Sequence, residues 1–422
     1  MNNQYITVPQ IKRVQLDYTT KCNALCLRCA RNVDGKYLNK NMPLADMPWN
    51  LYKSFLKPIV NSLELLDICG NYGDPPLHPD LIRGCDWMIS KQNIEARLKA
   101  GVKQELCIIN IATNGGINST GWWKELAQTL NKKYNTGDEI KQYPGKVVFG
   151  FDGLEDTNHI YRRQVNWKKC MENSKAFINA GGHAEWQFII FEHNEHQINE
   201  AKSMAFDMGF ENFFTVGGYG RNETIWEAEN PDEAIEGYAP MEQKGFAEEL
   251  TGDRVESGDK TNKNEKADLP YVIDKTADEN IDLFKEHLKQ YNNDIDKFWE
   301  HGRIQCRWDK NADSYTENQD GDPGLQFMFN GEVWPCCEVG GVRFGKKQVP
   351  WDDPNGNEMA YQFYQETHGK YGSKFNNLYY HTLEEILNHE WFSNKLVQSW
   401  KHDYDGDPAR LMLCGYTCSR FR

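Results

Sequence analysis

The sequence predicts an α/β protein, in which a largely parallel sheet with helices on its faces is followed by a smaller α+β region. Two patterns predict this fold class. Short apolar runs alternate with stretches of helical periodicity as far as about residue 217, which is typical of βα units. Nearer the C-terminus, strand-like residues flank an Asn-Gly pair, which favours a β-hairpin. Six βα repeats can form a partly closed barrel or an open doubly wound sheet, and periodicity does not choose between them.

The alternating part contains six expected strands with helices between them. The strands are expected at 14–18, 63–69, 106–112, 147–151, 185–191 and 213–216. The helices are expected near 48–60, 79–91, 120–132, 167–180 and 195–208. Because parallel strands end at one common edge, ligands are expected at the loops that follow these strands.

The pattern changes after residue 219. Residues 251–268 contain no aromatic residue and only one valine besides alanine, so we interpret them as a flexible insertion or linker. A helix with a core-facing apolar stripe is expected near 278–301. Further on, Asn330 and Gly331 are expected to form a type I′ turn, which places Cys336 after the returning strand. The expected domains are 1–220, a helical insertion or linker at 221–300, and 301–422.

Length, composition and charge narrow the function classes. The 422 residues suggest roughly two to three domains, and 39% hydrophobic with 13% aromatic residues excludes wholesale disorder. The net charge of −14 (48 basic against 62 acidic residues) disfavours nucleic-acid and anionic-membrane binding. No signal peptide or long apolar run is visible, so we expect a soluble, cytoplasmic protein. In a reducing compartment, 12 cysteines indicate metal binding or chemistry rather than disulfides.

Three of these cysteines, Cys22, Cys26 and Cys29, form a C-x3-C-x2-C array directly after the first expected strand. Soft thiolates select zinc, Cu(I) or iron–sulfur clusters. Three close ligands indicate a centre with one open position, as catalytic metal sites require. A zinc loop completed by a distant Cys or His is the alternative.

This array, in a loop after the first strand of a βα series, resembles the radical S-adenosylmethionine (SAM) superfamily. The resemblance covers about residues 14–217 and implies a partial (β/α)6 barrel. It implies that Cys22, Cys26 and Cys29 hold a [4Fe–4S] cluster whose fourth iron is chelated by SAM. It also implies reductive cleavage of SAM to a 5′-deoxyadenosyl radical, which abstracts a hydrogen from the substrate. Arg28 departs from the family pattern, in which this position is commonly aromatic or apolar.

Further segments follow successive strands at the positions that the resemblance assigns to SAM contacts. Gly73-Asp74-Pro75 resembles the family's Gly-Gly-Glu segment, whose acid meets the SAM amino group, with Asp74 in place of Glu. The residues that the resemblance implies for the SAM ribose and carboxylate are Thr113, Asn114 and Gly115 after the third strand, and Asp152, Arg162 and Arg163 after the fourth. Taken alone, such segments are ordinary strand-to-helix turns.

The C-terminal cysteines resemble parts of the SPASM and twitch extensions of radical SAM enzymes, which bind auxiliary [4Fe–4S] clusters. The resemblance implies one auxiliary cluster on Cys306, Cys336, Cys414 and Cys418, with Cys337 as a substitute ligand. A structural zinc site is the alternative. The remaining cysteines in core strands and helices are expected to be buried small hydrophobes, namely Cys69, Cys85, Cys107 and Cys170.

The leading hypothesis is a radical SAM enzyme with a C-terminal auxiliary-cluster domain. Peptide or protein modification is the favoured reaction, and a twitch-type dehydrogenase of small, sugar-like molecules is the alternative. Because only a short segment precedes the first expected strand, a separate domain for leader-peptide recognition is not expected. A non-catalytic zinc protein and an electron-transfer protein are hypotheses from other classes. The expected partners are the substrate and an electron donor such as a flavodoxin or ferredoxin, and no residue is identified as a catalytic acid or base.

Overall fold

The structure is a computed structural model that describes most of the chain up to residue 217 and shorter stretches from residue 324 onward. The described residues are 6–27, 29–33, 35–100, 106–135, 140–143, 145–191, 193–217, 324–344, 351–354, 358–401, 411 and 414. The expected linker at 221–300, its polar segment near 251–268 and the helix expected near 278–301 lie outside these residues, as do Cys306 and Cys418.

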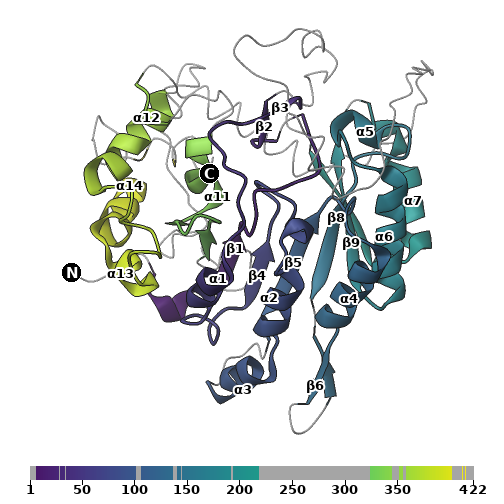
Figure 1. Cartoon of the computed structure of the whole chain (residues 1–422), viewed down its shortest axis with the longest axis horizontal. Coiled ribbons are helices and arrows are strands. Elements are labelled where there is room, and N and C mark those ends of the chain that lie inside the picture. Colours follow the sequence, from purple (N-terminus) through teal and green to yellow (C-terminus); the bar gives the residue numbers. More distant parts are fainter. Residues whose placement is uncertain are drawn as a thin grey trace.

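One eight-stranded sheet runs through the described part of the molecule, in the order β10-β9-β8-β5-β4-β1-β11-β12 (Figure 1). Its strands are β1 (Arg13–Leu16), β4 (Leu65–Ile68), β5 (Ile108–Thr113), β8 (Lys146–Gly150), β9 (His183–Ile190), β10 (Asn212–Gly217), β11 (Gly324–Phe327) and β12 (Val333–Trp334). All six strands expected up to residue 217 are present, and successive ones pair in parallel. The α/β class and the partial barrel of βα units are therefore confirmed.

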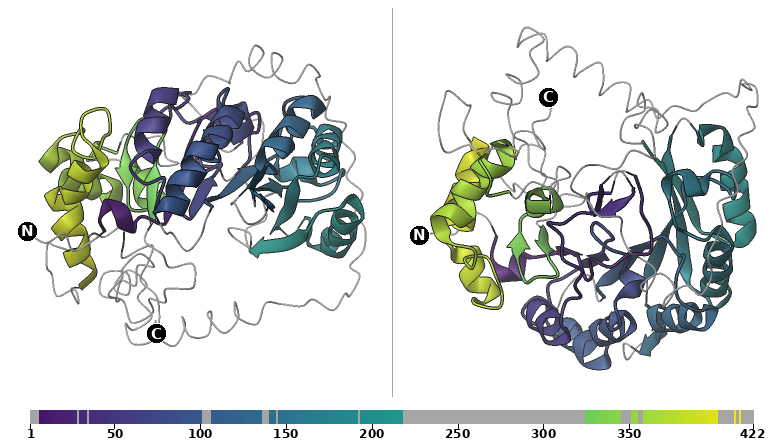
Figure 2. Two further views of the ribbon diagram at one scale, coloured as in Figure 1. Left: turned by 90° about the horizontal axis from the view of Figure 1, so that it is seen from below. Right: turned by 45° about the horizontal axis from the view of Figure 1, so that its top comes forward.

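Helices lie along the outer side of this curved sheet (Figure 2). They are α1 (Trp49–Leu56), α2 (Leu81–Met88), α3 (Lys91–Lys99), α4 (Thr120–Leu130), α5 (Asn158–Tyr161), α6 (Trp167–Asn179) and α7 (Ile198–Met208), with 3-10 turns η1 (Val8–Gln10), η2 (Pro75–Leu77) and η3 (Glu195–Gln197). Every second residue of β9 is buried, and Trp186 packs against Trp167 of α6. Among the described helices, none combines the length and apolar character needed to cross a bilayer.

The opposite face of the sheet carries polar side chains. Arg13 on β1 forms an ion pair with Asp67 on β4 at 2.8 Å, and Asn110 on β5 donates a hydrogen bond to the second oxygen of Asp67 at 3.0 Å. Lys146 on β8 pairs with Glu185 on β9 at 2.9 Å. The apolar core therefore lies on the helix side of the sheet, and the inner face is polar.

Two antiparallel ribbons and the helix α3 are among the observed elements that have no counterpart in the sequence analysis; α5 and the helices beyond β12 are others. The ribbons pair β2 (Asn32–Val33) with β3 (Tyr37–Leu38), and β6 (Lys133–Asn135) with β7 (Ile140–Gln142). The helix α3 has the sequence KQNIEARLK and offers little apolar periodicity. Its beginning is fixed by a cap, since the Ser90 hydroxyl accepts a hydrogen bond from the Asn93 amide.

The expected C-terminal hairpin is present as β11 and β12, but the expected type I′ turn is wrong. Of the two turn residues, only Gly331 has a positive φ, at 88°. Gly331 N donates to Met328 O at 2.9 Å and Met328 N donates to Glu332 O at 3.0 Å, which makes a longer loop with the glycine in the left-handed region. The strand β11 also pairs in parallel with β1, so the hairpin extends the main sheet.

The remaining described elements lie beyond β12 (Figure 1). They are α11 (Cys337–Gly341), η5 (Val342–Phe344), α12 (Glu358–Tyr364), the π-helix η6 (Gln365–Gly369), α13 (Leu383–Asn388), the π-helix η7 (Trp391–Leu396) and α14 (Val397–Lys401). Trp334 at the end of β12 packs against Trp391 at a ring distance of 5.7 Å, which joins these helices to the hairpin.

Candidate metal centre and cofactor site

The loop that follows β1 brings three thiols together. Cys26 is 7% exposed, Cys22 and Cys29 are partly exposed, and a turn forms where Cys29 N donates to Cys26 O at 3.1 Å. Each of the three thiols has another one close enough for the repulsion between their negative charges to raise its own pKa. The predicted trio is therefore gathered at the carboxyl end of β1.

Burial dominates the protonation of these thiols. It raises the pKa of Cys22 and of Cys26 to about 12, and it also raises the pKa of Cys29. Thiolates in this loop therefore need positive charge beside them. Bound metal ions supply this positive charge, and their binding displaces the thiol protons.

The described residues include no group of three Cys, His, Asp or Glu side chains arranged to hold one metal ion. A single zinc ion would require its ligands around one common point. In an iron–sulfur cluster each cysteine binds a different iron, so the sulfurs stand farther apart. Which of these two kinds of centre Cys22, Cys26 and Cys29 hold stays a prediction.

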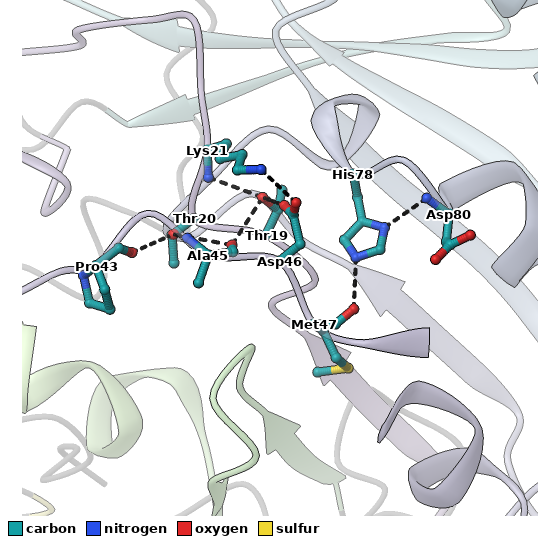
Figure 3. Close-up of polar contacts among 9 residues, drawn as sticks. All are labelled: Thr19, Thr20, Lys21, Pro43, Ala45, Asp46, Met47, His78 and Asp80. Carbon is teal, nitrogen blue, oxygen red and sulfur yellow. Dashed lines mark hydrogen bonds and ion pairs between the residues drawn. The ribbon is translucent and has the colours of Figure 1, made fainter. Parts of the chain in front are cut away.

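A neighbouring segment holds the cysteine loop from one side (Figure 3). The Thr20 hydroxyl donates to Pro43 O at 2.6 Å and accepts from Ala45 N at 2.8 Å. Thr20 N in turn donates to Ala45 O at 2.9 Å. These bonds fix the main chain two residues before Cys22.

The next residues of the same segment continue this attachment (Figure 3). Asp46 accepts from the Thr19 hydroxyl at 2.6 Å and forms an ion pair with Lys21 at 2.6 Å. His78 is 3% exposed and is bonded to Met47 O at 2.9 Å through Nε2. We therefore assign His78 a structural role, since its other ring nitrogen accepts from the main chain as well.

The loop after β4 carries a buried carboxyl group with an unused oxygen. Asp74 is 3% exposed, and its Oδ1 accepts from the Thr113 hydroxyl at 2.8 Å and from Asn114 N at 3.0 Å. Among the described residues, none donates to its Oδ2. Burial raises the pKa of Asp74 to about 6. A buried acceptor without a partner is unfavourable, so this oxygen is suited to a cationic donor from a ligand.

Asn114 connects this carboxyl group to the cysteines. Its side-chain amide donates to Asn23 Oδ1 at 2.8 Å and to Cys22 Sγ at 3.7 Å. Gly115, the next residue, has a φ of 71°, a main-chain conformation that residues other than glycine rarely adopt. The structure therefore brings the loops after β1, β4 and β5 to one place, as the sequence predicts.

The main chains of the loops after β1 and β4 pack directly against each other. A Cβ on Gly73 would lie 2.2 Å from Thr19 O and 2.8 Å from Lys21 O. Asp74 N donates to Lys21 O at 2.7 Å, and Pro75 begins the short turn η2. The close approach explains why a glycine precedes Asp74.

The predicted residues after β8 bind one another. Asp152 is fully buried, and its Oδ2 accepts from Arg162 Nε at 2.5 Å while its Oδ1 accepts from Ile189 N at 2.7 Å. The positive charge of the Arg162 guanidinium also acts to lower the pKa of the nearby Cys26 thiol. A Cβ on Gly150 would lie 2.5 Å from Arg162 Nη2, so glycine leaves room for this group. Contacts of Asp152 and Arg162 with SAM stay predictions.

Arg163 supports the cysteine loop from another side. Its main-chain oxygen accepts from Leu25 N at 3.0 Å, and its guanidinium reaches Gly35 O at 3.4 Å. A SAM contact for Arg163 also stays a prediction.

Two buried charged groups beside the site were missed by the sequence analysis. Arg31 is 2% exposed and donates to main-chain oxygens of the cysteine loop. Asp17 is fully buried directly after β1, where it is bonded to Gln326 and Cys69, and burial raises its pKa to about 7. A single Arg or Asp has no motif spacing, so only the sequence position beside the array could have drawn attention to either.

Three of the C-terminal cysteines are described. Cys336 stands at the N-cap position of α11 just after the hairpin, Cys337 is the first residue of that helix, and Cys414 is buried. Both Cys336 and Cys337 lie beyond β12, which ends at Trp334, so the alternation of side chains along a strand does not place them on opposite faces. Membership of an auxiliary site stays a prediction for these cysteines.

The segment that begins at Cys337 contacts the loops of the three-cysteine site. The Tyr72 hydroxyl donates to Cys337 O at 3.5 Å, and the Asn39 amide donates to Phe344 O at 2.8 Å. The hairpin end and the three-cysteine site therefore lie side by side.

The other cysteines divide into two kinds. Those on helices and before β5 are buried as expected, namely Cys85, Cys107 and Cys170. Cys69, in contrast, is partly exposed, because it follows β4 instead of lying within the strand. The expectation of full burial is therefore wrong for Cys69.

Comparison with known proteins gives structural matches only. No protein-family model and no curated protein matches the sequence. Among solved structures, Streptococcus suis SuiB bound to S-adenosylmethionine is similar, with 13% identity, a TM-score of 0.41, and coverage of 79% of this chain and 62% of that one. SuiB bound to precursor peptide SuiA has 13% identity, a TM-score of 0.41, and coverage of 96% and 76%. Native anSMEcpe with bound AdoMet has 13% identity, a TM-score of 0.36, and coverage of 50% and 52%.

These solved structures are radical SAM enzymes, the class of protein that the motifs predict. At such identities and TM-scores, the matches carry no argument about this chain's substrate or chemistry. This chain also spans only 62% of SuiB in its SAM-bound form. The features that bear on chemistry are the chain's own: three thiols, an unpaired carboxylate oxygen and two buried guanidinium groups near the strand ends.

Proposed function

We propose that this protein is a radical SAM enzyme whose [4Fe–4S] cluster is held by Cys22, Cys26 and Cys29. The observation that carries the proposal is the link between two features at one edge of the sheet. Asp74 has a buried, unpaired Oδ2, and Asn114 bonds both Asp74 and Cys22. A ligand with a cationic group, bound beside a metal-binding cysteine loop, would account for both features.

The residues present fit this cofactor pair. When bound, the cluster supplies the electron that cleaves SAM, and the nucleoside radical released then removes a hydrogen atom from the substrate. Asp74 Oδ2 would accept from the SAM ammonium, while the Thr113 hydroxyl and the Asn114 main-chain amide hold the Asp74 carboxylate in place. Gly115 lets the main chain come close to the ligand. The positive charge of Arg162 favours the thiolate form of Cys26.

The substrate that we propose is a peptide or protein. The support is the C-terminal cysteine pattern, which resembles the extensions found on many peptide-modifying members. An auxiliary cluster on Cys306, Cys336, Cys414 and Cys418 belongs to the same proposal. Oxidation of a small, sugar-like molecule is the second candidate, because twitch-type extensions also occur in enzymes that oxidise such molecules. A flavodoxin or ferredoxin in the cytoplasm is the electron donor we propose.

The test is an anaerobic reconstitution with iron and sulfide, followed by reduction, addition of SAM and measurement of 5′-deoxyadenosine. The wild-type chain is expected to release this nucleoside, and Cys26→Ala is expected to release none. Cys85→Ala serves as the control, since Cys85 is a buried cysteine on α2 away from the loop. Protein that binds zinc without iron, or clusters that are redox-active without SAM cleavage, would replace the proposal by the zinc or electron-transfer hypothesis.

A second measurement separates the two substrate classes. Deuterated peptides and deuterated sugar-like molecules are offered in turn, and deuterium is sought in the 5′-deoxyadenosine. Transfer from the peptide supports the proposal, whereas transfer only from the small molecule favours the dehydrogenase.

A further inference from the structure

Arg31 lies inside the cysteine loop rather than on its surface. Its side chain is folded back on the loop, where Nε donates to Thr20 O at 2.8 Å, Nη1 to Ala24 O at 3.1 Å and Nη2 to Cys22 O at 3.2 Å. Only 2% of the residue is exposed. One guanidinium group thus gathers the main chain on both sides of Cys22.

The main chain of Arg31 and the next side chain extend this network. Arg31 O accepts from Asn39 N at 2.8 Å, and the Asn32 amide donates to Cys26 O at 3.3 Å. The loop is therefore tied together from within at Cys22 and at Cys26. The attachments at Thr20 and Asp46 hold only its beginning.

No described carboxylate lies within ion-pair distance of Arg31, although Asp74 is close enough for the arginine charge to act to lower its pKa. The three hydrogen-bond acceptors of Arg31 are neutral main-chain oxygens. Arg162, by contrast, pairs with Asp152. A buried cation without an anion is unfavourable unless an anion is bound nearby. Its neighbours of suitable chemistry are Cys22, Cys29 and Asp74.

We infer that Arg31 is a positioning residue that shapes the cysteine loop before metal is bound and supplies the positive charge that an anionic thiolate centre requires. This inference rests on the proposed function for the cluster, but its first part concerns the loop itself. Because no described carboxylate pairs with Arg31, its charge is available to the centre that the three cysteines bind.

The geometry of the side chain explains why arginine is used. A planar guanidinium offers donors in a fixed fork, and here three nitrogens reach three separate main-chain oxygens. Lysine carries the same charge on one nitrogen and cannot span these oxygens. Methionine has a similar length without charge or donors. The two substitutions therefore separate the shaping role from the charge.

The chain offers a matched control in Arg97. This arginine is also 2% exposed, and its Nη1 donates to the main-chain oxygens Val60 O and Leu63 O at 2.7 and 2.5 Å. It lies on α3, away from the cysteine loop. Arg97→Met therefore measures the effect of losing a buried arginine that is not part of the cysteine loop.

The first measurement is amide hydrogen exchange in cluster-free protein. Arg31→Met is expected to lose protection within the loop from Thr20 to Asn32, whereas Arg97→Met is expected to lose it near α3 only. Arg31→Lys is expected to lose part of the loop protection. Unchanged loop protection in Arg31→Met, or equal loss in Arg97→Met, overturns the shaping role, whether or not the wild type binds a cluster.

The second measurement uses protein reconstituted with iron and sulfide. Loss of a group that orients metal ligands typically weakens metal affinity on the order of tenfold or more, so Arg31→Met is expected to retain less iron than wild type. Its cluster is expected to have a lower reduction potential, because a nearby positive charge favours the reduced, more negative state. Arg31→Lys is expected to stay closer to the wild-type potential. Equal potentials in wild type and Arg31→Met would overturn the charge role, whereas a wild type without any cluster would overturn the proposed function instead.

Discussion

At Asp74, one carboxylate oxygen has two donors and the other has none. Asp74→Asn keeps an acceptor for Thr113 and for Asn114 N but removes the negative charge. Hydrogen bonds to charged groups contribute about 1.5–3 kcal/mol, so the SAM affinity of the reconstituted protein is expected to fall roughly tenfold or more. Equilibrium dialysis with SAM measures this change. Asp80→Asn, a change at the partly exposed N-cap of α2, is the control and is expected to bind as wild type.

The same carboxyl group predicts a pH dependence with a definite sign. Since burial raises the pKa of Asp74 to about 6, the carboxylate form predominates above that pH and the neutral acid below it. Only the carboxylate attracts the SAM ammonium, so wild-type affinity is expected to fall as the pH decreases from 7 to 5. Asp74→Asn is expected to show no such fall. A parallel decline in both proteins would assign the pH effect to another group.

Residues such as Asp74 were found from the sequence because they belong to a short motif after a strand. Arg31 and Asp17 were not, although both are buried beside the site. Their roles depend on what surrounds them after folding. Arg31 acts on carbonyl groups, which every residue has, and Asp17 meets Gln326 only because β11 pairs with β1.

At the scale of elements, the packing of two loops depends on the absence of one side chain at Gly73. A methyl group there would lie 2.2 Å from Thr19 O, a main-chain atom that has no room to move. Gly73→Ala is expected to destabilise the fold by about 1–3 kcal/mol, as overpacking does, and to lower the iron bound after reconstitution. Urea denaturation and iron analysis measure the two effects.

Gly121 provides the matched control for this glycine substitution. A Cβ there would meet Ser119 Oγ at 3.6 Å, an ordinary contact, at the beginning of α4. Gly121→Ala is expected to leave iron binding unchanged and to raise stability by up to about 1 kcal/mol. If Gly73→Ala behaved in the same way, the close packing of the cysteine loop on the loop after β4 would not matter for the site.

The sequence predicts elements well where the apolar pattern is strong, and less well where geometry decides. The six strands up to residue 217 follow from short apolar runs, and their order along the chain is their order in the sheet. The helix α3 lacks such a pattern and was missed. At Asn330-Gly331 the hairpin was predicted but the turn type was wrong, because neighbouring contacts decide whether one or both residues take a positive φ.

At the scale of the whole molecule, the C-terminal hairpin completes the sheet that carries the three-cysteine site. No local signal in residues 324–334 indicates that β11 will lie beside β1, since this pairing joins segments about three hundred residues apart. Phe327 of β11 is fully buried and stacks on Phe55 of α1 with a ring distance of 4.1 Å. Asp17 N, just before the cysteine loop, donates to Phe327 O at 2.9 Å.

Phe327→Ala is therefore expected to weaken the sheet both in β11 and in the N-terminal strands beside it. Truncation of a buried phenylalanine costs about 3–5 kcal/mol, and here the loss should appear as reduced amide protection in β1 and β4 as well as in β11. Hydrogen exchange read strand by strand makes this measurement. Phe206→Ala, at a 49% exposed position on α7, is the control and is expected to change stability by less than about 0.5 kcal/mol. Protection lost in β11 alone would mean that the hairpin folds independently of the sheet, and that the cysteine loop after β1 does not depend on it.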